Sequence, residues 1–598
     1  MKKLRASSLA LGLSLVVSFL ALAQAARREA SAPPARSPRL AVLVSVDGVQ
    51  MKRLLDYRPY FVAGLKQLLD EGHVERNAHY AHLNTETGPG HASLGTGAPP
   101  RVTGIVANRW FQPRADGSLR PVYCTDQPYV DPETRVEGFR PGPGNLRVPT
   151  LGDRLLEKYP AARVVSLSGK DRGAIFMAGK RREHAVYWWD QRTGRFVSSP
   201  AYDVRSPGGA VVAGIVDRYN RTRAGGHLPR RIGLAWRKMA DPACLPPPSP
   251  GTPRPVPELE MRPFQIPVNG LGWDKDMSLA SNGYFHGLYY SPFIDELTID
   301  LALEVLASKE LELGHEEQPD ILCLSLSGQD TVSHAYGAES EENLDALRRL
   351  DVQLGRLLET LGRTFPDGKV VLALSADHGF QTIPEREARV DKTFTGGRIL
   401  TGNGAVTNFE ERLNRYVCEE LCLPSGSRPI FGNEGFDVKY NLPALPTMRT
   451  VAGPCGEAGR PVTRDDVDRV LPGAIARLWH EEFRTVLLAS KKESWDRSDR
   501  DVRFALNDHD AERSGEAILI PRRGVILYPD ARGGTHGSHY VYDTHVPLLF
   551  WGGGVAAGVS DAERTPYDFA PTVGKLLGVA LPDAVGTAIE LPRQTAKP

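Results

Sequence analysis

The sequence predicts an α/β protein with a doubly wound, mostly parallel central sheet that carries helices on both faces. Short runs of β-branched and apolar residues recur along the chain, and such runs are typical of strands buried in a parallel sheet. Segments with apolar residues at helical spacing lie between these runs. Strands that alternate with helices form parallel sheets, because each helix carries the chain back over one face.

The elements follow one another along most of the chain. Leucines recur at helical spacing in the longest predicted helix, which covers residues 344–361. Shorter helices are predicted at about 53–71 and at 294–305. The predicted strands are 40–46, 163–167, 321–326, 370–374 and 545–551.

Two stretches interrupt this alternation. Residues of about 181–290 and 391–514 are rich in Pro, Gly, Arg and charge, and their apolar residues show little periodicity. We expect both to be insertions that pack as cap segments over the carboxyl edge of the sheet. The catalytic domain that contains them is predicted to span residues 39–598.

The N-terminus has the pattern of a signal peptide over residues 1–25. Three basic residues precede an apolar stretch, and a small-x-small sequence ends at Ala25. A Pro/Ala/Ser/Arg-rich linker is predicted over residues 26–38. The protein is therefore predicted to be exported, either to the periplasm or outside the cell.

Charge and hydropathy narrow the function further. The 598 residues include 73 Lys+Arg and 72 Asp+Glu, for a formal net charge of +1, so no basic excess predicts a nucleic-acid partner. No later apolar stretch reaches the roughly 18 residues of a membrane span, so no membrane span is predicted in the mature chain.

Among six cysteines, Cys323 lies in a strand-like run and is predicted to be a buried free thiol. Cys418, Cys422 and Cys455 could include one disulfide, which the sequence does not pair.

Carboxylates and imidazoles follow several predicted strands at the point where each strand ends. Ligands of open α/β sheets bind beyond the carboxyl ends of the strands. Three carboxylates and three imidazoles form a donor set suited to two zinc ions. The residues that we expect to bind these metals are Asp47, Asp330, His334, Asp377, His378 and His536.

Thr87 is the candidate nucleophile. It precedes Gly-Pro-Gly, a tight turn that could open a helix with its backbone N–H groups aimed at an anion. A threonine hydroxyl is a poor nucleophile unless a metal or a base removes its proton. A zinc ion bound by Asp47, Asp377 and His378 would do this.

The order of these residues resembles that of the alkaline phosphatase superfamily. More narrowly, three motifs resemble those of the PafA-type threonine-dependent bacterial alkaline phosphatases: TGPGH from Thr87, GIVANRWF from Gly104 and SGKDRG from Ser168. The resemblance covers most of the mature chain except the two insertions.

The resemblance implies two zinc ions per chain and the ligands of each. One zinc ion would be held by Asp330, His334 and His536. The other would be held by Asp47, Thr87, Asp377 and His378, with Thr87 as the nucleophile. Three further residues would contact the phosphoryl group: Asn108, Lys170 and Arg172.

This constellation predicts an alkaline phosphatase that hydrolyses small-molecule phosphate monoesters through a phosphothreonine. Lys170 and Arg172 suit the free oxygens of a phosphate dianion. A phosphodiesterase or nucleotide pyrophosphatase of the same superfamily is the alternative, because it shares the metals and a threonine. An exported binding protein on a retired phosphatase fold is a further alternative, which loss of a ligand would indicate.

Overall fold

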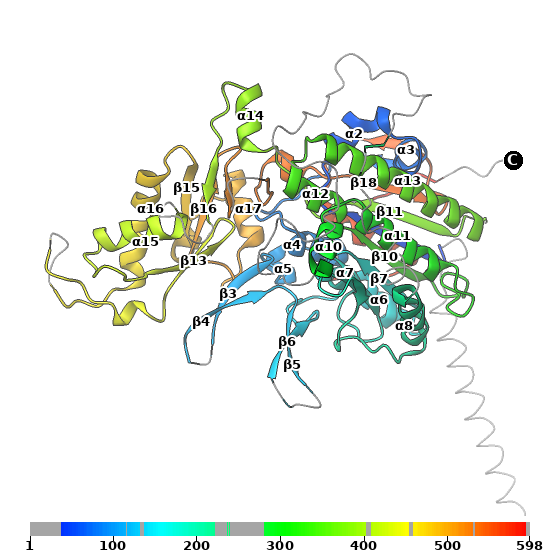
Figure 1. The fold of residues 1–598 in the computed structure, drawn as a ribbon, viewed down its shortest axis with the longest axis horizontal. Coiled ribbons are helices and arrows are strands. Elements are labelled where there is room, and N and C mark those ends of the chain that lie inside the picture. Colours follow the sequence, from blue (N-terminus) through cyan, green and yellow to red (C-terminus); the bar gives the residue numbers. More distant parts are fainter. Residues whose placement is uncertain are drawn as a thin grey trace, which may run out of the picture.

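A computed structural model describes residues 38–593 (Figure 1). The description has gaps at 115, 132–134, 136, 222–235, 237, 240–279, 367, 402–407, 454–457 and 530–532. The predicted signal peptide and almost all of the predicted linker lie outside the described residues.

A sheet of nine strands forms the centre of the molecule. Its strand order is β19-β2-β18-β11-β1-β10-β7-β8-β9. The strands are β1 (Leu40–Val46), β2 (His73–Glu75), β7 (Val164–Ser168), β8 (Ala185–Asp190), β9 (Arg195–Val197), β10 (Asp320–Leu326), β11 (Val370–Ser375), β18 (Leu548–Gly552) and β19 (Gly558–Ser560).

The interior of this sheet is parallel and its flanks are mixed. β1 pairs in parallel with both β10 and β11, and β10, β7 and β8 continue the parallel run. β18 runs antiparallel to β11 and β2, and β9 runs antiparallel to β8. The predicted α/β fold is confirmed, with a mixed rather than uniformly parallel sheet.

Helices cover both faces of the sheet, because successive side chains of each strand point to opposite sides. Leu40, Val42 and Val44 of β1 pack into one apolar cluster, and Ala41 and Leu43 pack into another. The first cluster is covered by α2 (Met51–Tyr57), α3 (Gly64–Glu71), α8 (Pro207–Tyr219), α10 (Ala280–Tyr289), α11 (Phe293–Leu306) and α13 (Glu341–Thr364). The second is covered by α4 (Thr87–Thr96), α6 (Leu151–Lys158), α7 (Asp171–Ala178) and α19 (Phe569–Leu577). Among the helices of the described residues, none is both long and apolar enough to cross a membrane.

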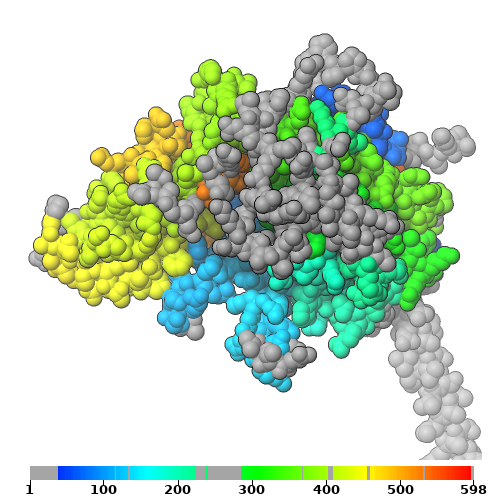
Figure 2. Space-filling model, in the orientation of Figure 1, coloured from blue at the N-terminus to red at the C-terminus, as the bar shows by residue number. Residues whose placement is uncertain are grey.

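The chain beyond α14 (Pro384–Val390) forms a lobe with a sheet and a core of its own, seen at the left of Figures 1 and 2. The strand order of this sheet is β13-β14-β16-β15. The lobe contains α15 (Phe409–Glu420), β13 (Ile430–Glu434), β14 (Asp437–Tyr440), α16 (Arg464–Leu478), β15 (Phe483–Leu488), α17 (Arg500–Asp508) and β16 (Ala517–Pro521). A short parallel pair, β12 (Arg398–Leu400) and β17 (Ile526–Tyr528), joins it to the rest. The lobe therefore extends past the predicted insertion of 391–514 and is regular, whereas the sequence indicated little periodicity.

The first predicted insertion and the last predicted strand also differ from the structure. β8 and β9 lie within 181–290 but belong to the central sheet, so this stretch does not begin as a cap. His545 ends the short helix α18 (Val541–Thr544) instead of opening a strand. Pro547 explains the later start of β18, because proline has no N–H for a strand ladder.

Two hairpins project beside the lobe (Figure 1). β3 (Arg109–Pro113) pairs with β4 (Leu119–Tyr123), and β5 (Asp126–Val130) pairs with β6 (Glu137–Pro141). They follow the short helix α5 (Pro100–Thr103). The sequence patterns did not predict them, although the first hairpin carries groups that reach the candidate site.

The cysteines among the described residues are free thiols or disulfide-bonded. Cys323 is a buried free thiol, as predicted, and Cys124 and Cys418 are also buried and free. Cys422 is disulfide-bonded. Cys455, which the sequence left as a possible partner, lies outside the described residues.

Candidate active site

The carboxyl ends of three neighbouring strands bring most of the predicted metal-binding residues together. β1 lies between β10 and β11 with Val46 level with Leu326 and Ser45 level with Ser375, so the three strands end side by side. Asp47 follows β1, and Asp377 and His378 follow β11. Helix α12 (Gly328–Tyr336) follows β10 and carries the other predicted pair, Asp330 in its first turn and His334 in its last.

His536 reaches the same place from the loop before α18. Its Nε2 lies 3.7 Å from Asp330 Oδ1, and its ring stacks on the ring of His378 with 3.6 Å between the centroids. His334 Nε2 lies 3.4 Å from Asp330 Oδ1. His378 Nε2 lies 3.4 Å from both Asp47 Oδ1 and Asp377 Oδ2. All six residues therefore converge on one site.

The backbone holds each of the three imidazoles in the form that a metal requires. Nδ1 of His378, His334 and His536 lies within 2.8 Å of a carbonyl oxygen, those of Gly379, Gly534 and Thr85 respectively. A carbonyl only accepts hydrogen bonds, so each Nδ1 carries the proton and each Nε2 keeps a lone pair that faces the carboxylate oxygens, where a cation between them could be bound. Burial also lowers the pKa of His334 and of His536, which keeps both rings neutral.

The carboxylates of this site are buried, and only part of their charge is compensated by neighbouring side chains. Asp47, Asp330 and Asp377 are at most 1% exposed. Burial and the neighbouring Asp377 raise the pKa of Asp47 well above its usual range. Burial acts on Asp377 in the same direction, but His378 and His91 hold its pKa below the usual range.

Several ligand atoms of the site also lack hydrogen bonds. Within the described residues, Asp47 Oδ1, Asp330 Oδ1 and His378 Nε2 are buried without a hydrogen-bond partner. Buried carboxylates and unpaired acceptors are costly unless cations meet them. The donor set therefore fits a pair of metal ions, and its mixture of nitrogen and oxygen is typical of zinc.

The two most compact groups of ligand atoms differ slightly from the predicted sets. Asp47, Asp377 and His378 lie within 4.8 Å of one another, as do Asp330, His378 and His536. His378 thus belongs to both groups, and His334 stands outside the second although it contacts Asp330. The division of ligands between two ions stays a prediction.

Thr87 is the first residue of α4 and is 1% exposed. The helix can approach the metal-ligand loop because Gly90 has no side chain. A Cβ there would lie 2.1 Å from the carbonyl oxygen of Asp377. The glycine at position 90 is therefore required by this close packing against Asp377, and not by an unusual backbone conformation of the turn.

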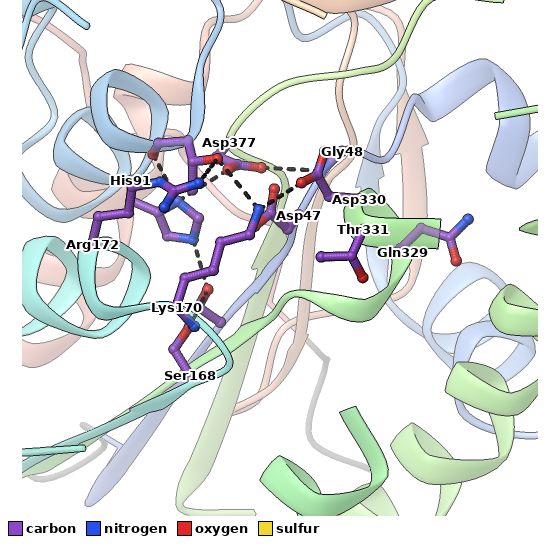
Figure 3. Close-up of polar contacts among 12 residues, drawn as sticks. Asp47, Gly48, His91, Ser168, Lys170, Arg172, Gln329, Asp330, Thr331 and Asp377 are labelled. Carbon is purple, nitrogen blue, oxygen red and sulfur yellow. Dashed lines mark hydrogen bonds and ion pairs between the residues drawn. The ribbon is translucent and has the colours of Figure 1, made fainter. Parts of the chain in front are cut away.

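Two cations converge on the hydroxyl of Thr87. Lys170 Nζ lies 3.4 Å from Thr87 Oγ1, and Arg172 Nη2 lies 3.3 Å from it. Lys170 also pairs with Asp47 Oδ2 at 2.5 Å and with Asp330 Oδ2 at 2.6 Å (Figure 3). These two carboxylates raise the pKa of Lys170 against the opposite effect of burial, so the amine stays charged.

Asn108 completes the predicted set around Thr87. Its Oδ1 accepts a hydrogen bond of 2.8 Å from the N–H of Gly88, which leaves the NH₂ group as the part of the amide that can serve a ligand. The backbone N–H of Asn108 donates to Glu86, the residue before Thr87. The structure thus brings every predicted site residue to one place, while their roles stay predictions.

Sequence reasoning missed two residues that support this site. Tyr123 in the β3–β4 hairpin accepts a hydrogen bond of 2.9 Å from Arg172 Nη1 and donates one of 2.7 Å to Asp171. Nothing in its neighbouring sequence marks it. His91 lies 3.1 Å from Asp377, and its spacing of four residues from Thr87 within one helix was the available signal.

Comparisons with known proteins agree with this geometry. The family model of the type I phosphodiesterases and nucleotide pyrophosphatases matches residues 41–540. The chain belongs to this family. Proteins named alkaline phosphatase also match nearly the whole chain, so the resemblance to the alkaline phosphatase superfamily drawn from the motifs is confirmed.

Two of the relatives illustrate this similarity. The alkaline phosphatase PhoK of a Sphingomonas species is 28% identical over 92% of this chain and 90% of its own. The alkaline phosphatase PafA of Elizabethkingia meningoseptica is 26% identical over 92% of this chain and 94% of its own. The crystal structure of PafA has the same fold, with a TM-score of 0.73, 23% identity, and coverage of 92% of this chain and 98% of that one.

Proposed function

We propose that this protein is an exported alkaline phosphatase that hydrolyses phosphate monoesters through a phosphothreonine at Thr87, with two zinc ions per chain. The observation that carries the proposal is the convergence of Lys170 and Arg172 on Thr87 Oγ1, at 3.4 and 3.3 Å. A phosphoryl group joined to that oxygen would meet both cations. Three carboxylates and three neutral imidazoles beside it support the metals.

The relatives support a monoesterase. PhoK and PafA are alkaline phosphatases, and each matches this chain over nine-tenths of its length. A solved structure of PafA carries substitutions at a threonine, an asparagine, a lysine and an arginine. These follow one another in the same order and at the same separations as Thr87, Asn108, Lys170 and Arg172.

In the proposed reaction, Thr87 Oγ1 forms a bond to phosphorus while the bond from phosphorus to the alcohol oxygen breaks. The threonine proton passes to solvent, and the alcohol leaves with a proton from water. Water then attacks the phosphothreonine, and Thr87 Oγ1 leaves and regains its proton as phosphate is released. Zinc ions held by the carboxylates and imidazoles would lower the pKa of the threonine hydroxyl and offset charge on the entering and leaving oxygens.

The remaining side chains of the site would bind the phosphoryl oxygens. Lys170 supplies a compact charge, while Arg172 supplies a planar fork whose second arm is held by Tyr123. The amide of Asn108 can donate to a third position. Charge in phosphoryl transfer is spread over these oxygens, so donors fixed before the reaction stabilise the transition state.

Hydrolysis of diesters is the second candidate, favoured by the family model that matches the chain. A diester has one charged oxygen fewer and carries a substituent in its place. Two cations close to the phosphoryl site, Lys170 at 4% exposure and the partly buried Arg172, suit the monoester better. We therefore propose diesterase activity only as a side reaction.

Export rests on the N-terminal pattern and on Cys422. Residues 1–25 have the order of a signal peptide, and disulfides such as that of Cys422 persist mainly in oxidising compartments. Both observations favour the periplasm or the exterior of the cell.

The test compares kcat/KM for a phosphomonoester and a phosphodiester that share one chromogenic leaving group. The monoester is expected to be the better substrate, and acid-quenched protein should carry a phosphate on Thr87 by peptide mass spectrometry. Thr87→Ala should lose that label and most turnover while retaining zinc. A better diester substrate, or near-native turnover by Thr87→Ala, would contradict the proposal.

A further inference from the structure

We infer that His91 is a positioning residue that fixes the metal-binding carboxylate of Asp377 and ties it to the loop of Lys170. The inference rests on the proposed function, because it assigns Asp377 to a metal. His91 lies in α4, four residues after Thr87, and its side chain is fully buried. It belongs neither to the predicted metal ligands nor to the predicted phosphoryl-binding residues.

The contacts of His91 determine where its proton lies. Nδ1 is 2.9 Å from the carbonyl oxygen of Thr87 and 3.1 Å from Asp377 Oδ2. Both oxygens are acceptors, so Nδ1 carries a proton, which it donates to the carbonyl of Thr87 while Asp377 Oδ2 lies close beside it. One side chain thereby touches the backbone of the candidate nucleophile and a candidate metal ligand.

The other ring nitrogen joins a chain of hydrogen bonds that runs in one direction. The N–H of Lys170 donates to Ser168 Oγ at 2.9 Å, and the hydroxyl of Ser168 donates to Ser325 Oγ at 3.0 Å. Ser325 Oγ lies 2.9 Å from His91 Nε2. A neutral ring with its proton on Nδ1 lets Ser325 donate to Nε2, so every member of this chain has a partner. Figure 3 shows His91, Ser168 and Lys170 at this site.

Packing leaves this chain little room to rearrange. Ser168 and Ser325 lie on the neighbouring strands β7 and β10, and both are buried. A Cβ at Gly173 of α7 would lie 2.4 Å from Ser325 Oγ and 2.7 Å from Ser168 Oγ. The two hydroxyls are therefore held between the sheet and α7, so His91 has fixed partners on both sides.

The two oxygens of Asp377 have different surroundings. Asp377 Oδ1 already accepts from the N–H groups of Gly48 and His378. Oδ2 lies between two rings, 3.1 Å from His91 Nδ1 and 3.4 Å from His378 Nε2, so it is the oxygen that remains for a metal and His91 limits where it can lie. Partners that orient a ligating carboxylate in this way typically change metal affinity by about 10–100-fold when they are removed.

Two substitutions separate the two ring nitrogens. In His91→Asn the amide nitrogen has the same number of bonds from the backbone as Nδ1, so it can still donate to Asp377. In His91→Gln the amide reaches the place of Nε2, so the contact with Ser325 is kept and the contact with Asp377 is lost. His82→Gln is the matched control, because His82 is equally buried and pairs with Tyr567 instead.

The experiment measures zinc affinity of the full-length protein by competition with a chromophoric chelator, together with kcat and KM for a phosphomonoester. His91→Gln should weaken one of the two zinc ions by about 10–100-fold, and His91→Asn and His82→Gln should stay within about threefold of wild type. Equal weakening in His91→Asn and His91→Gln would mean that the ring acts by packing, which overturns the inference. Wild-type affinity in His91→Gln would overturn it as well, whereas a wild type that binds no zinc would overturn the proposed function itself.

Discussion

Removal of the Arg172 guanidinium should lower the activity on phosphomonoesters far more than the activity on diesters. Of the two cations, Arg172 gives the more specific test when it is replaced by Ala, because Arg172 contacts Thr87 and Tyr123 but none of the three site carboxylates. Lys170 by contrast pairs with Asp47 and Asp330, so its removal also disturbs two candidate metal ligands. A loss in Arg172→Ala that is larger for the monoester than for the diester can therefore be attributed to the phosphoryl group.

The magnitude follows from one hydrogen bond that Arg172 Nη2 is expected to donate to a charged phosphoryl oxygen, since it lies 3.3 Å from Thr87 Oγ1, the oxygen proposed to bond to phosphorus. A hydrogen bond to a charged group contributes roughly 1.5–3 kcal/mol. At about 1.4 kcal/mol per tenfold in rate, kcat/KM for the monoester should fall by about 10- to 150-fold. Because Lys170 and Arg172 meet at one oxygen, the double variant should depart from the product of the single losses.

The assay is kcat/KM for a monoester and a diester with one leaving group, measured with zinc saturating and with metal content checked. The ratio of monoester to diester activity should fall at least about tenfold in Arg172→Ala, since the diester lacks the charged oxygen that this arm meets. Arg192→Ala, an exposed arginine outside the site, should leave both substrates unchanged. Equal losses on monoester and diester would refute the reasoning and favour a general structural role.

Three further outcomes are expected. Removal of metals with EDTA should abolish phosphatase activity and added zinc should restore it, with two zinc ions per chain by elemental analysis; full activity of verified metal-free protein would exclude the two-metal proposal. Asp351→Ala should lower the free energy of unfolding, measured by urea titration, by about 2–4 kcal/mol. The reason is that Asp351 of α13 accepts hydrogen bonds from the N–H groups of residues 62, 63, 65 and 66 at the start of α3. The control is Glu359→Ala, exposed on the same helix, which should change this free energy by less than about 0.5 kcal/mol. Burial would raise the pKa of Asp153, but its hydrogen bond with His184 holds it below the usual range. A lowered pKa in the folded state stabilises the protein above the unfolded pKa of about 3.9 and less as the pH falls below it, so acid should destabilise wild type more steeply than Asp153→Asn; parallel curves would contradict this.

The sequence predicted the parallel interior of the sheet well because those strands are buried on both faces. β1 has the predicted bounds, and β10 and β11 begin or end within one residue of the prediction. Every residue of β1 is buried, so its whole run is apolar or small and carries a clear signal. β8 has the same signal, with Ala185–Asp190 rich in aromatic residues, but the Pro- and Gly-rich composition around it concealed the strand.

The candidate site was predictable as far as it follows strand ends. Asp47, Asp330 and Asp377 lie where parallel strands terminate, so their proximity follows from topology alone. His536 follows no strand of the parallel core, and only its Gly-rich setting and the family motif marked it. Tyr123 could not be predicted, because its contact with Arg172 depends on how the β3–β4 hairpin packs against α7.

The candidate metal ligands and the two candidate phosphoryl-binding cations come from different elements of the fold. The candidate metal ligands follow β1, β10 and β11 or come from the loop before α18, whereas Lys170 and Arg172 follow β7, which pairs with β10 on the side away from β1. The β3–β4 hairpin anchors Arg172 from outside the sheet through Tyr123. A change at Arg172 or in the hairpin can therefore alter the charge near Thr87 without touching a candidate metal ligand, whereas a change at Lys170 also affects Asp47 and Asp330. The family whose model matches this chain is named for diesterases, while PhoK and PafA, which match nine-tenths of the chain, are named alkaline phosphatases. Arg172 and the hairpin that anchors it are therefore the elements whose change we expect to shift the preference between monoesters and diesters.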